Sequence, residues 1–296
     1  MLLSVATDVF LYTIGMRRGL NGYTSAKRVL NTIGMKAVLF DLDGVFYQVN
    51  DPIPGGADVL SWVREQGIPY LFITNTTSKN RLDLVAKLFE MGMTVDIEHI
   101  LTPPVAAVAW LQLHQKKHIA LCVPHPVRNE FSRFTTVQAG QPEGAVDAVV
   151  VGDLGEEWTY GKLNDAFRLL MSTPQPALIA LGMTRYWQAQ DGLRLDVAPF
   201  VTALQHASSA QPVVMGKPSA DFYHTALSML GANAEDTVIV GDDLYMDIDG
   251  AQQLGMRGLL VRTGKFRARD LQAGVHPYAV LNSIAELPVW WEEHAG

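Results

Sequence analysis

Short hydrophobic runs recur along the chain from residue 37 onward, and polar or amphipathic stretches separate them. Most of these runs are rich in β-branched or aromatic residues and are flanked by Gly, Pro, Asp or Asn. Such features favour buried β-strands over helices. The predicted strands are Ala37–Phe40, Tyr70–Ile73, Ile119–Val123, Ala148–Val151, Ala177–Leu181, Val213–Met215, Thr237–Val240 and Gly258–Val261.

Amphipathic segments lie between the runs, with hydrophobic residues spaced three or four positions apart as on one face of a helix. The predicted helices are Ala57–Glu65, Arg81–Met91, Val105–His114, Lys162–Met171 and Asp221–Leu230. Pro103-Pro104 and the segment from Gln138 to Glu143 are predicted loops. Alternation of strands and helices predicts an α/β fold in which helices cover both faces of parallel sheets.

Residues 116–211 carry strands and helices of their own. We therefore expect a smaller α/β cap domain inserted into a doubly wound core that comprises residues 35–115 and 212–296. Residues 1–34 precede the first predicted strand and are interpreted as an N-terminal extension of unknown role. Because basic residues outnumber acids in this leader, a mitochondrial-type presequence is an alternative interpretation. A start placed too early, upstream of Met35, is another.

Composition restricts the class of protein. The chain has 296 residues, of which 48% are hydrophobic and 18% charged, and this balance excludes intrinsic disorder as its main state. A net charge of −7 and the absence of a basic run argue against duplex nucleic acid as a partner. The apolar start, Met1–Gly15, is too short to cross a membrane and is interrupted by Asp8. A lone cysteine, Cys122, fits a reducing compartment, so we expect a cytoplasmic protein.

Polar side chains follow several predicted strands at the point where each strand ends. They are Asp41 and Asp43, Thr74 and Asn75, Lys217, and Asp242, Asp243 and Asp247. Taken singly, these residues are typical of turns and helix caps. Ligands of doubly wound sheets bind at the carboxyl ends of the strands, so the joint occurrence indicates one shared site.

The residue types in this predicted site suit phosphoryl transfer. Carboxylate oxygens are the ligands that Mg²⁺ prefers, and the ion usually keeps water and substrate phosphate in its shell. One carboxylate can attack phosphorus, and a second can protonate the leaving oxygen and later deprotonate water. A lysine together with the metal ion balances the charge of the phosphoryl oxygens.

Four motifs in this order resemble those of the haloacid dehalogenase (HAD) superfamily of phosphohydrolases. They are Phe40-Asp41-Leu42-Asp43-Gly44-Val45, Thr74-Asn75, Lys217, and Gly241-Asp242-Asp243 with Asp247. The segment between Asn75 and Lys217 is similar to the C2-type cap of the class IIA branch. The resemblance runs from about residue 35 to residue 290 and implies a Rossmann-like core with that cap.

The resemblance implies a role for each motif residue that would contact the substrate. Asp41 would be the nucleophile, and Asp43 would be the general acid and base. Thr74 and Asn75 would hold the phosphate group. Lys217 would stabilise both the nucleophile and the charge of the phosphoryl group.

The resemblance also implies Mg²⁺ as the cofactor. Asp41 and Asp242 would bind the ion through their carboxylates, and Asp43 through its backbone carbonyl. Asp243 or Asp247 would lie behind these ligands and act through water.

The predicted cap offers one further candidate site, Arg185-Tyr186-Trp187, which follows the predicted strand Ala177–Leu181. A cation beside two aromatic rings could read the leaving group of a substrate. Alternatively, Tyr186 and Trp187 simply begin another strand, and the pattern leaves both interpretations open.

The functional hypothesis is a Mg²⁺-dependent phosphatase that acts on a small phosphorylated substrate through a covalent aspartyl-phosphate on Asp41. The substrate could be a phosphomonoester, a phosphoamide or pyrophosphate. A phosphotransferase on the same core and a non-enzymatic phosphate-binding relative are the alternatives, whereas the presence of Asp43 argues against a dehalogenase. A homo-oligomer formed through the cap is a partner that the sequence leaves open.

Overall fold

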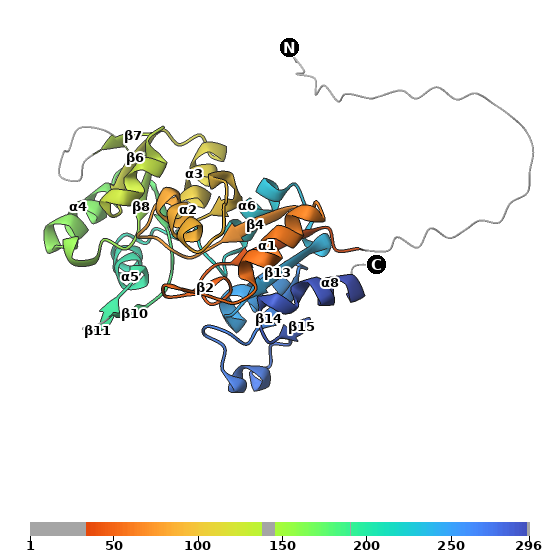
Figure 1. Cartoon of the computed structure of the whole chain (residues 1–296). Coiled ribbons are helices and arrows are strands. Elements are labelled where there is room, and N and C mark those ends of the chain that lie inside the picture. The colour runs from red at the N-terminus through yellow and green to blue at the C-terminus, as the bar shows by residue number, and fades with distance from the viewer. Residues whose placement is uncertain (1–33, 138–145, 190, 295–296) are drawn as a thin grey trace, which may run out of the picture. The chain divides into compact units, whose positions relative to one another are not determined.

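The computed structural model describes residues 34–137, 146–189 and 191–294 (Figure 1). These described residues belong to one compact unit. The predicted N-terminal extension, apart from Gly34, and the predicted loop from Gln138 to Glu143 lie outside the described residues. Within the described residues, no helix is both long and apolar enough to cross a membrane.

The described residues form two parallel sheets, of which the larger has six strands in the order β15-β14-β13-β1-β4-β5. Its central strand β1 pairs with β13 on one side and with β4 on the other, both in parallel. The strands are β1 (Ala37–Asp41), β4 (Tyr70–Ile73), β5 (Ile100–Leu101), β13 (Thr237–Gly241), β14 (Arg257–Val261) and β15 (Ala279–Leu281).

Helices cover both faces of this sheet because side chains of successive strand residues point to opposite faces. Val38 and Phe40 pack into one hydrophobic cluster with residues of α1 (Gly56–Glu65), α2 (Arg81–Glu90) and α8 (Leu287–His294). Leu39 packs into a second cluster on the opposite face. That cluster contains residues of α3 (Pro103–Leu113), α6 (Ala220–Leu230) and α7 (Gly250–Gln252).

The second sheet has five parallel strands in the order β12-β9-β8-β6-β7. One of its faces contributes Ile119, Val150 and Ile179 to the same cluster as Leu39, so the two sheets share a hydrophobic layer. The opposite face packs on α4 (Tyr160–Leu170) and α5 (Val197–Ser208). The strands are β6 (His118–Cys122), β7 (Thr135–Val137), β8 (Ala148–Val151), β9 (Ala177–Ala180) and β12 (Pro212–Val214).

Two short antiparallel hairpins complete the described strands. The first joins β2 (Tyr47–Gln48) to β3 (Asp51–Pro52), directly after the motif that contains Asp41 and Asp43. The second joins β10 (Tyr186–Ala189) to β11 (Gly192–Leu195) and leads into α5 (Figure 1).

The doubly wound α/β architecture with a second, smaller sheet confirms the predicted fold class, and each predicted strand is present to within one residue at either end. One detail was wrong. Pro103 and Pro104 begin α3 instead of forming a loop, because the fixed φ of proline suits the first turn of a helix. Val213 and Val214 form the edge strand β12 of the second sheet, where β12 pairs with β9.

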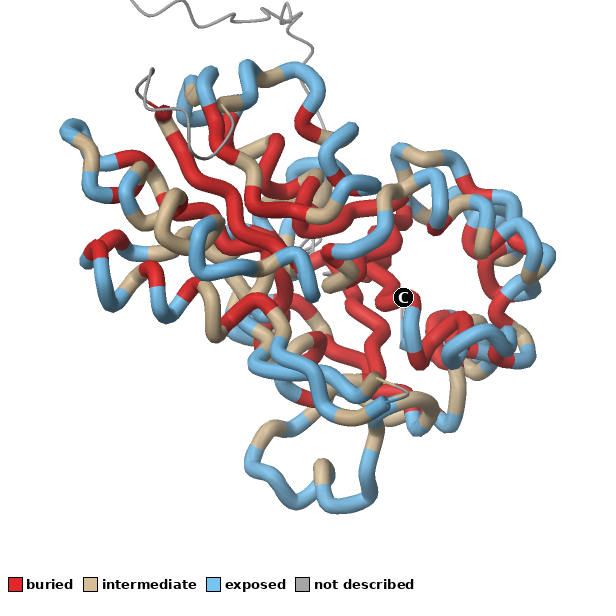
Figure 2. Tube along the Cα trace, turned by 90° about the vertical axis from the view of Figure 1, so that its left-hand side faces the viewer, coloured by how far each residue is buried: buried red, intermediate tan, exposed pale blue. Residues whose placement is uncertain are grey.

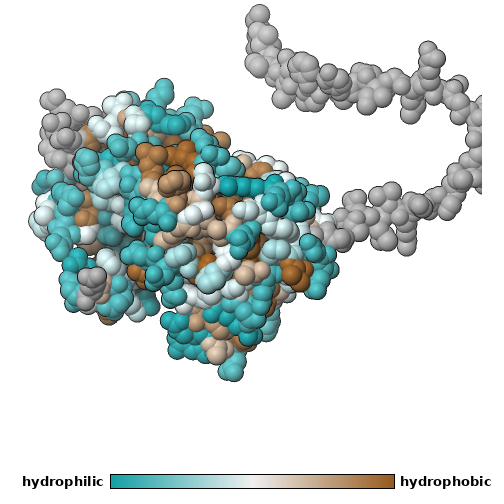
Figure 3. Space-filling model, viewed as in Figure 1, coloured by the Kyte–Doolittle hydropathy of each residue, from teal (hydrophilic) through white to brown (hydrophobic). Residues whose placement is uncertain are grey.

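Burial follows the strands. Figure 2 shows buried segments in the interior and exposed ones at the periphery. Hydrophobic residues also reach the surface, and Figure 3 shows some of them gathered over α2 and α3. These helices carry the exposed side chains Leu82, Phe89 and Leu113.

Phe46 anchors the hairpin after β1 to the sheet. Its fully buried ring meets Phe40 and Phe72 edge-on, with ring centroids 5.2 and 5.0 Å apart. Truncation leaves a cavity that the sheet cannot close, so Phe46→Ala should lower the free energy of unfolding by about 3–5 kcal/mol. Urea denaturation measures this loss. Phe89→Ala is the control because that ring is 66% exposed, and an equal loss in both variants would contradict the anchoring role.

Candidate active site

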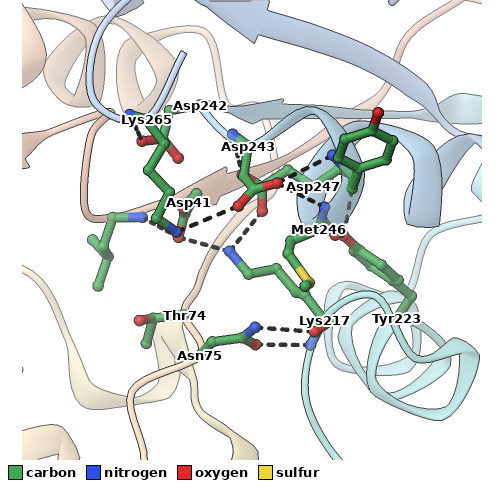
Figure 4. Close-up of polar contacts among 12 residues, drawn as sticks. Asp41, Thr74, Asn75, Lys217, Tyr223, Asp242, Asp243, Met246, Asp247 and Lys265 are labelled. Carbon is green, nitrogen blue, oxygen red and sulfur yellow. Dashed lines mark hydrogen bonds and ion pairs between the residues drawn. The ribbon is translucent and has the colours of Figure 1, made fainter. Parts of the chain in front are cut away.

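The polar residues predicted to share a site do converge at the carboxyl end of the larger sheet (Figure 4). Asp41 is the last residue of β1, and Asp242 directly follows β13. Thr74 follows β4, while Lys217 lies on the turn between β12 and α6. Parallel strands bring these ends together although the residues are up to 201 positions apart in the sequence (242 − 41).

Lys217 is the centre of a buried ion-pair system. Its Nζ lies 2.7 Å from Asp41 Oδ1 and 2.7 Å from Asp247 Oδ1. The Lys217 side chain is 3% exposed, so water contributes little to its solvation. Burial by itself would lower the pKa of Lys217, but the carboxylates of Asp247 and Asp41 raise it above its usual value. The ammonium group therefore stays charged.

Asp242 has one satisfied and one unsatisfied carboxylate oxygen. Its Oδ2 accepts a hydrogen bond of 2.7 Å from the backbone N–H of Lys265. Its Oδ1 is buried and has no hydrogen-bond partner among the described residues. A buried carboxylate oxygen without a partner costs free energy unless another group, such as a cation, binds to it.

Two glycines allow the chain to approach the carboxylate of Asp242. Both Gly44 and Gly264 have positive φ values, of 85° and 61°. A Cβ atom at Gly44 would lie 1.9 Å from Asp242 Oδ2, and one at Gly264 would lie 2.0 Å from the same oxygen. Thr263 fastens the two loops together because its Oγ1 donates a hydrogen bond of 2.5 Å to the carbonyl of Gly44. Side chains other than hydrogen are therefore excluded at both positions.

Negative charge is concentrated at this site. Asp41, Asp242 and Asp247 each offer an oxygen that lies within 4.8 Å of the others, and all three residues are buried. Burial, and then the negative charge of Asp41, raise the pKa of Asp242 to about 7. Lys217 supplies only one positive charge against these three carboxylates, so a divalent cation would balance the cluster.

The donor set fits Mg²⁺. Hard carboxylate oxygens surround a common position, and the unpartnered Oδ1 of Asp242 is available as a ligand. The cluster contains one residue with a different predicted role. Asp247, predicted to act from behind through water, belongs to the cluster itself. The predicted contact of Asp43 with the ion is through its backbone carbonyl, and its side chain is exposed.

Asn75 contacts the backbone of Lys217 with both ends of its amide group. Its Nδ2 donates to the Lys217 carbonyl at 3.0 Å, and its Oδ1 accepts from the Lys217 N–H at 2.8 Å. Asn75 therefore positions the lysine in the structure, and the phosphate contact that the resemblance implies for Asn75 stays a prediction. Thr74 is buried, and its Oγ1 lies 3.2 Å from both the backbone N and Oγ1 of Thr76.

Asp243 acts as a helix cap. Its Oδ1 accepts hydrogen bonds from the N–H groups of Tyr245 and Met246, at 3.1 and 3.0 Å, at the start of the π-helical segment Leu244–Asp249. Its Oδ2 lies 3.6 Å from Lys265 Nζ. Of the two adjacent acids, only Asp242 belongs to the cluster of three carboxylates.

The candidate residues of the predicted cap lie on the second hairpin. Tyr186 and Trp187 are the first two residues of β10, so they do begin another strand. Their side chains are 51% and 43% exposed. The guanidinium carbon of Arg185 lies 5.8 Å from the centre of the Tyr186 ring. Among the described residues, none of the three has a recorded polar contact with the buried acids.

Some residues of the site were not predicted. Tyr223 of α6 donates from its hydroxyl to the carbonyls of Met246 and Asp247, at 2.7 and 3.1 Å, and so fixes the segment that carries Asp247. No motif pointed to this tyrosine. Gly264 and Lys265 were visible as residues after the strand Gly258–Val261, but their contact with Asp242 depends on the fold.

Comparison with known proteins shows what the chain is similar to. A family model described as haloacid dehalogenase-like hydrolase matches residues 38–134, and one described as HAD-hydrolase-like matches residues 214–287. Phospholysine phosphohistidine inorganic pyrophosphate phosphatase of Danio rerio is 37% identical over 242 residues, which cover 80% of this chain and 86% of that protein. Haloacid dehalogenase-like hydrolase domain-containing protein 2 of Rattus norvegicus is 37% identical over 246 residues, covering 83% and 89%.

Solved structures agree with these matches. A hypothetical protein from Pyrococcus horikoshii superposes with a TM-score of 0.79 at 28% identity and covers 86% of this chain and 99% of its own. The 4-nitrophenylphosphatase from Thermotoga maritima superposes with a TM-score of 0.76 at 25% identity, covering 86% and 97%.

The carboxylate cluster predicts stabilisation by magnesium. At a concentration 100 times its Kd, a ligand of the folded state adds about 2.7 kcal/mol, which corresponds to a rise in Tm of about 5–10 °C. Asp242→Asn should abolish the rise while keeping or raising the metal-free Tm, because it removes one of three crowded charges. Thermal unfolding with MgCl₂, and with KCl at equal ionic strength, measures both effects. Asp270→Asn, on an exposed helix, is the control, and a Mg²⁺ response that survives in Asp242→Asn contradicts the site.

Proposed function

The chain belongs to the haloacid dehalogenase-like hydrolases, and we propose that it is a Mg²⁺-dependent phosphatase that acts through a covalent phosphoryl group on Asp41. The observation that carries this proposal is the buried Asp41–Lys217–Asp247 ion-pair system beside the unpartnered oxygen of Asp242. A nucleophile, a fixed positive charge and a cation site thereby meet at one position.

In the first step, a carboxylate oxygen of Asp41 attacks phosphorus and the bond from phosphorus to the leaving group breaks. The Asp41 Oδ1 accepts a hydrogen bond of 2.8 Å from the Leu42 N–H and contacts Lys217, so the carboxylate is held in one orientation. The ammonium group of Lys217 stabilises the negative charge on the phosphoryl oxygens.

Asp43 transfers the protons. Its carboxyl group donates a proton to the leaving oxygen or nitrogen in the first step and accepts one from water in the second. Water then attacks phosphorus, the bond to Asp41 breaks, and inorganic phosphate leaves with the carboxylate restored. The exposed position of Asp43, two residues beyond the buried Asp41, supports this role because the group must meet both leaving group and water.

Asp41, Asp242 and Asp247, with the backbone carbonyl of Asp43, are the residues that would hold Mg²⁺. When bound there, the ion neutralises charge on the phosphoryl group and helps to orient it. The acidic cluster and the unpartnered Asp242 oxygen support this assignment.

In this proposal the two sheets have different roles in the reaction. Residues 35–115 together with the chain after Met215 would form the catalytic core, and the second sheet with its helices, residues 118–214, would form the cap over the substrate. The names of the similar proteins support a small phosphomonoester, a phosphoamide or pyrophosphate as the substrate.

The test is a screen of the purified protein with Mg²⁺ against phosphomonoesters, phosphoamidates and pyrophosphate. With glycerol added as a second acceptor, the fraction of phosphoryl groups transferred to glycerol should be the same for every substrate, because all pass through the same phosphorylated Asp41. A fraction that varies with the leaving group would contradict a common intermediate. Transfer that exceeds hydrolysis at low glycerol would indicate a phosphotransferase instead.

Asp41→Asn should abolish turnover while preserving the fold, because an amide oxygen is a poor nucleophile. Steady-state rates on the best substrate of the screen, together with circular dichroism, measure the two effects. Residual activity within about tenfold of the unsubstituted protein, equivalent to about 1.4 kcal/mol in the barrier, would remove Asp41 from the nucleophile's role.

Asn75→Ala should lower kcat more than it raises KM, because it removes both hydrogen bonds that fix the backbone of Lys217 without changing the lysine itself, which can then shift. A displacement of about 1 Å at a reacting group can cost about 100-fold in rate. Asn80→Ala is the matched control: it removes the hydrogen bond of 2.9 Å that caps α2 and destabilises the protein by about 1 kcal/mol. Equal kinetic losses in both variants would show that Asn75 acts only through stability.

A further inference from the structure

A cavity of about 490 Å³ lies in the part of the structure that forms the proposed cap. Aromatic and acidic side chains line it together. The lining includes Trp158, Trp187, Phe200, Asp153, Asp191 and Arg194.

The aromatic rings come from three separate elements. Trp158, just before α4, stacks on Phe200 of α5 with ring centroids 4.7 Å apart and an interplanar angle of 14°. Trp187 lies on β10 of the second hairpin and is 43% exposed. Faces of such rings carry negative potential and attract cations, most strongly when water is excluded.

The charges of the cavity leave one acid without compensation. Arg194 Nη2 lies 2.6 Å from Asp191 Oδ2, and Arg194 Nη1 lies 3.3 Å from Glu156 Oε1, so this arginine is already engaged by two acids. Asp153 forms no ion pair with any residue that the structure describes, and its Oδ1 accepts only the N–H of Gly155, at 3.0 Å. Burial, and to a lesser degree the charge of Asp153, raise the pKa of the adjoining Asp196.

The cavity lies near the carboxyl end of β8, in the neighbourhood of the turn between β12 and α6 that carries Lys217. Asp153 lies two residues after Val151, whose carbonyl accepts a hydrogen bond of 2.9 Å from Leu181 at the end of β9. Gly216, which precedes Lys217, packs so closely on Leu181 that a Cβ would lie 3.1 Å from the Leu181 carbonyl oxygen. The end of β8 next to the cavity is therefore linked to the turn that carries Lys217 through the neighbouring end of β9.

We propose that this cavity binds an organic ammonium group. We further propose that this ammonium group belongs to the non-phosphate part of the substrate, an assignment that rests on the proposed function. The preferred substrates are then small phosphorylated compounds that carry a primary or quaternary ammonium. Trp158, Trp187 and Phe200 provide the aromatic faces, and Asp153 provides the opposite charge. The same acid disfavours phosphorylated compounds with a carboxylate in that position.

Binding is tested without turnover, in the Asp41→Asn background. The probes are choline and 3,3-dimethylbutan-1-ol, which has the same shape without the charge, and calorimetry gives both Kd values. Choline should bind at least about tenfold more tightly than the neutral alcohol. Adding Asp153→Asn or Trp187→Leu should weaken choline binding about 5- to 30-fold, as expected for one cation contact.

The control substitutions are Asp221→Asn, an exposed acid on α6, and Tyr160→Leu, an exposed aromatic of α4 that does not line this cavity. Both should leave choline binding unchanged. Equal affinity for the charged and neutral probes, or choline binding that does not respond to either cavity substitution, would overturn the ammonium site.

Turnover by the enzyme with Asp41 intact tests whether the ammonium group belongs to the substrate. The value of kcat/KM for phosphocholine should exceed that for 3,3-dimethylbutyl phosphate, and Asp153→Asn should remove the difference. Choline binding without such a preference would overturn the assignment of the ammonium group to the substrate. Choline binding with no turnover of any phosphate compound would instead overturn the proposed function and would leave the ammonium site standing.

Discussion

The contact of the Lys217 ammonium with the carboxylates of Asp41 and Asp247 is the interaction on which the candidate site depends. An isolated charge at this depth would be strongly unfavourable, so neither the lysine nor the acids could be buried alone. Each partner is held from a different direction: Asn75 fixes the backbone of Lys217, and Tyr223 fixes the segment that carries Asp247. Removing one partner leaves an unpaired charge on the others.

Close backbone approach is the second constraint, because three carboxylates and a lysine must fit into the space where the strands end. Gly44 and Gly264 meet this requirement around Asp242 by having no side chain and by adopting positive φ values. The resulting cluster carries more negative than positive charge. A divalent cation would relieve that imbalance, which is why the same geometry that crowds the acids also suits Mg²⁺.

Chemistry and selectivity are divided between the two sheets in our proposal. The larger sheet provides groups that treat every phosphate ester alike, because they contact only the phosphoryl group and the leaving atom bonded to it. The cavity of the second sheet, with Trp187 and Asp153, offers an aromatic and acidic environment. Different leaving groups would interact with it to different degrees. Both sheets contribute to one hydrophobic cluster, whereas Trp158 and Phe200 of the cavity pack with the cluster on the opposite face of the second sheet.

The sequence by itself determined the alternation of strands and helices and the residues that end the central strands, because these depend on local patterns of hydrophobicity. It therefore predicted that Asp41 and Asp242 would meet, and the order of the four motifs added Lys217, which follows the edge strand β12 of the second sheet. Only the tertiary structure decided that Asp247 joins the carboxylate cluster, that Asn75 holds Lys217, and that Trp187 lines a cavity with Asp153. These outcomes depend on distances between side chains far apart in the sequence, which follow from packing of the sheets and leave no local pattern.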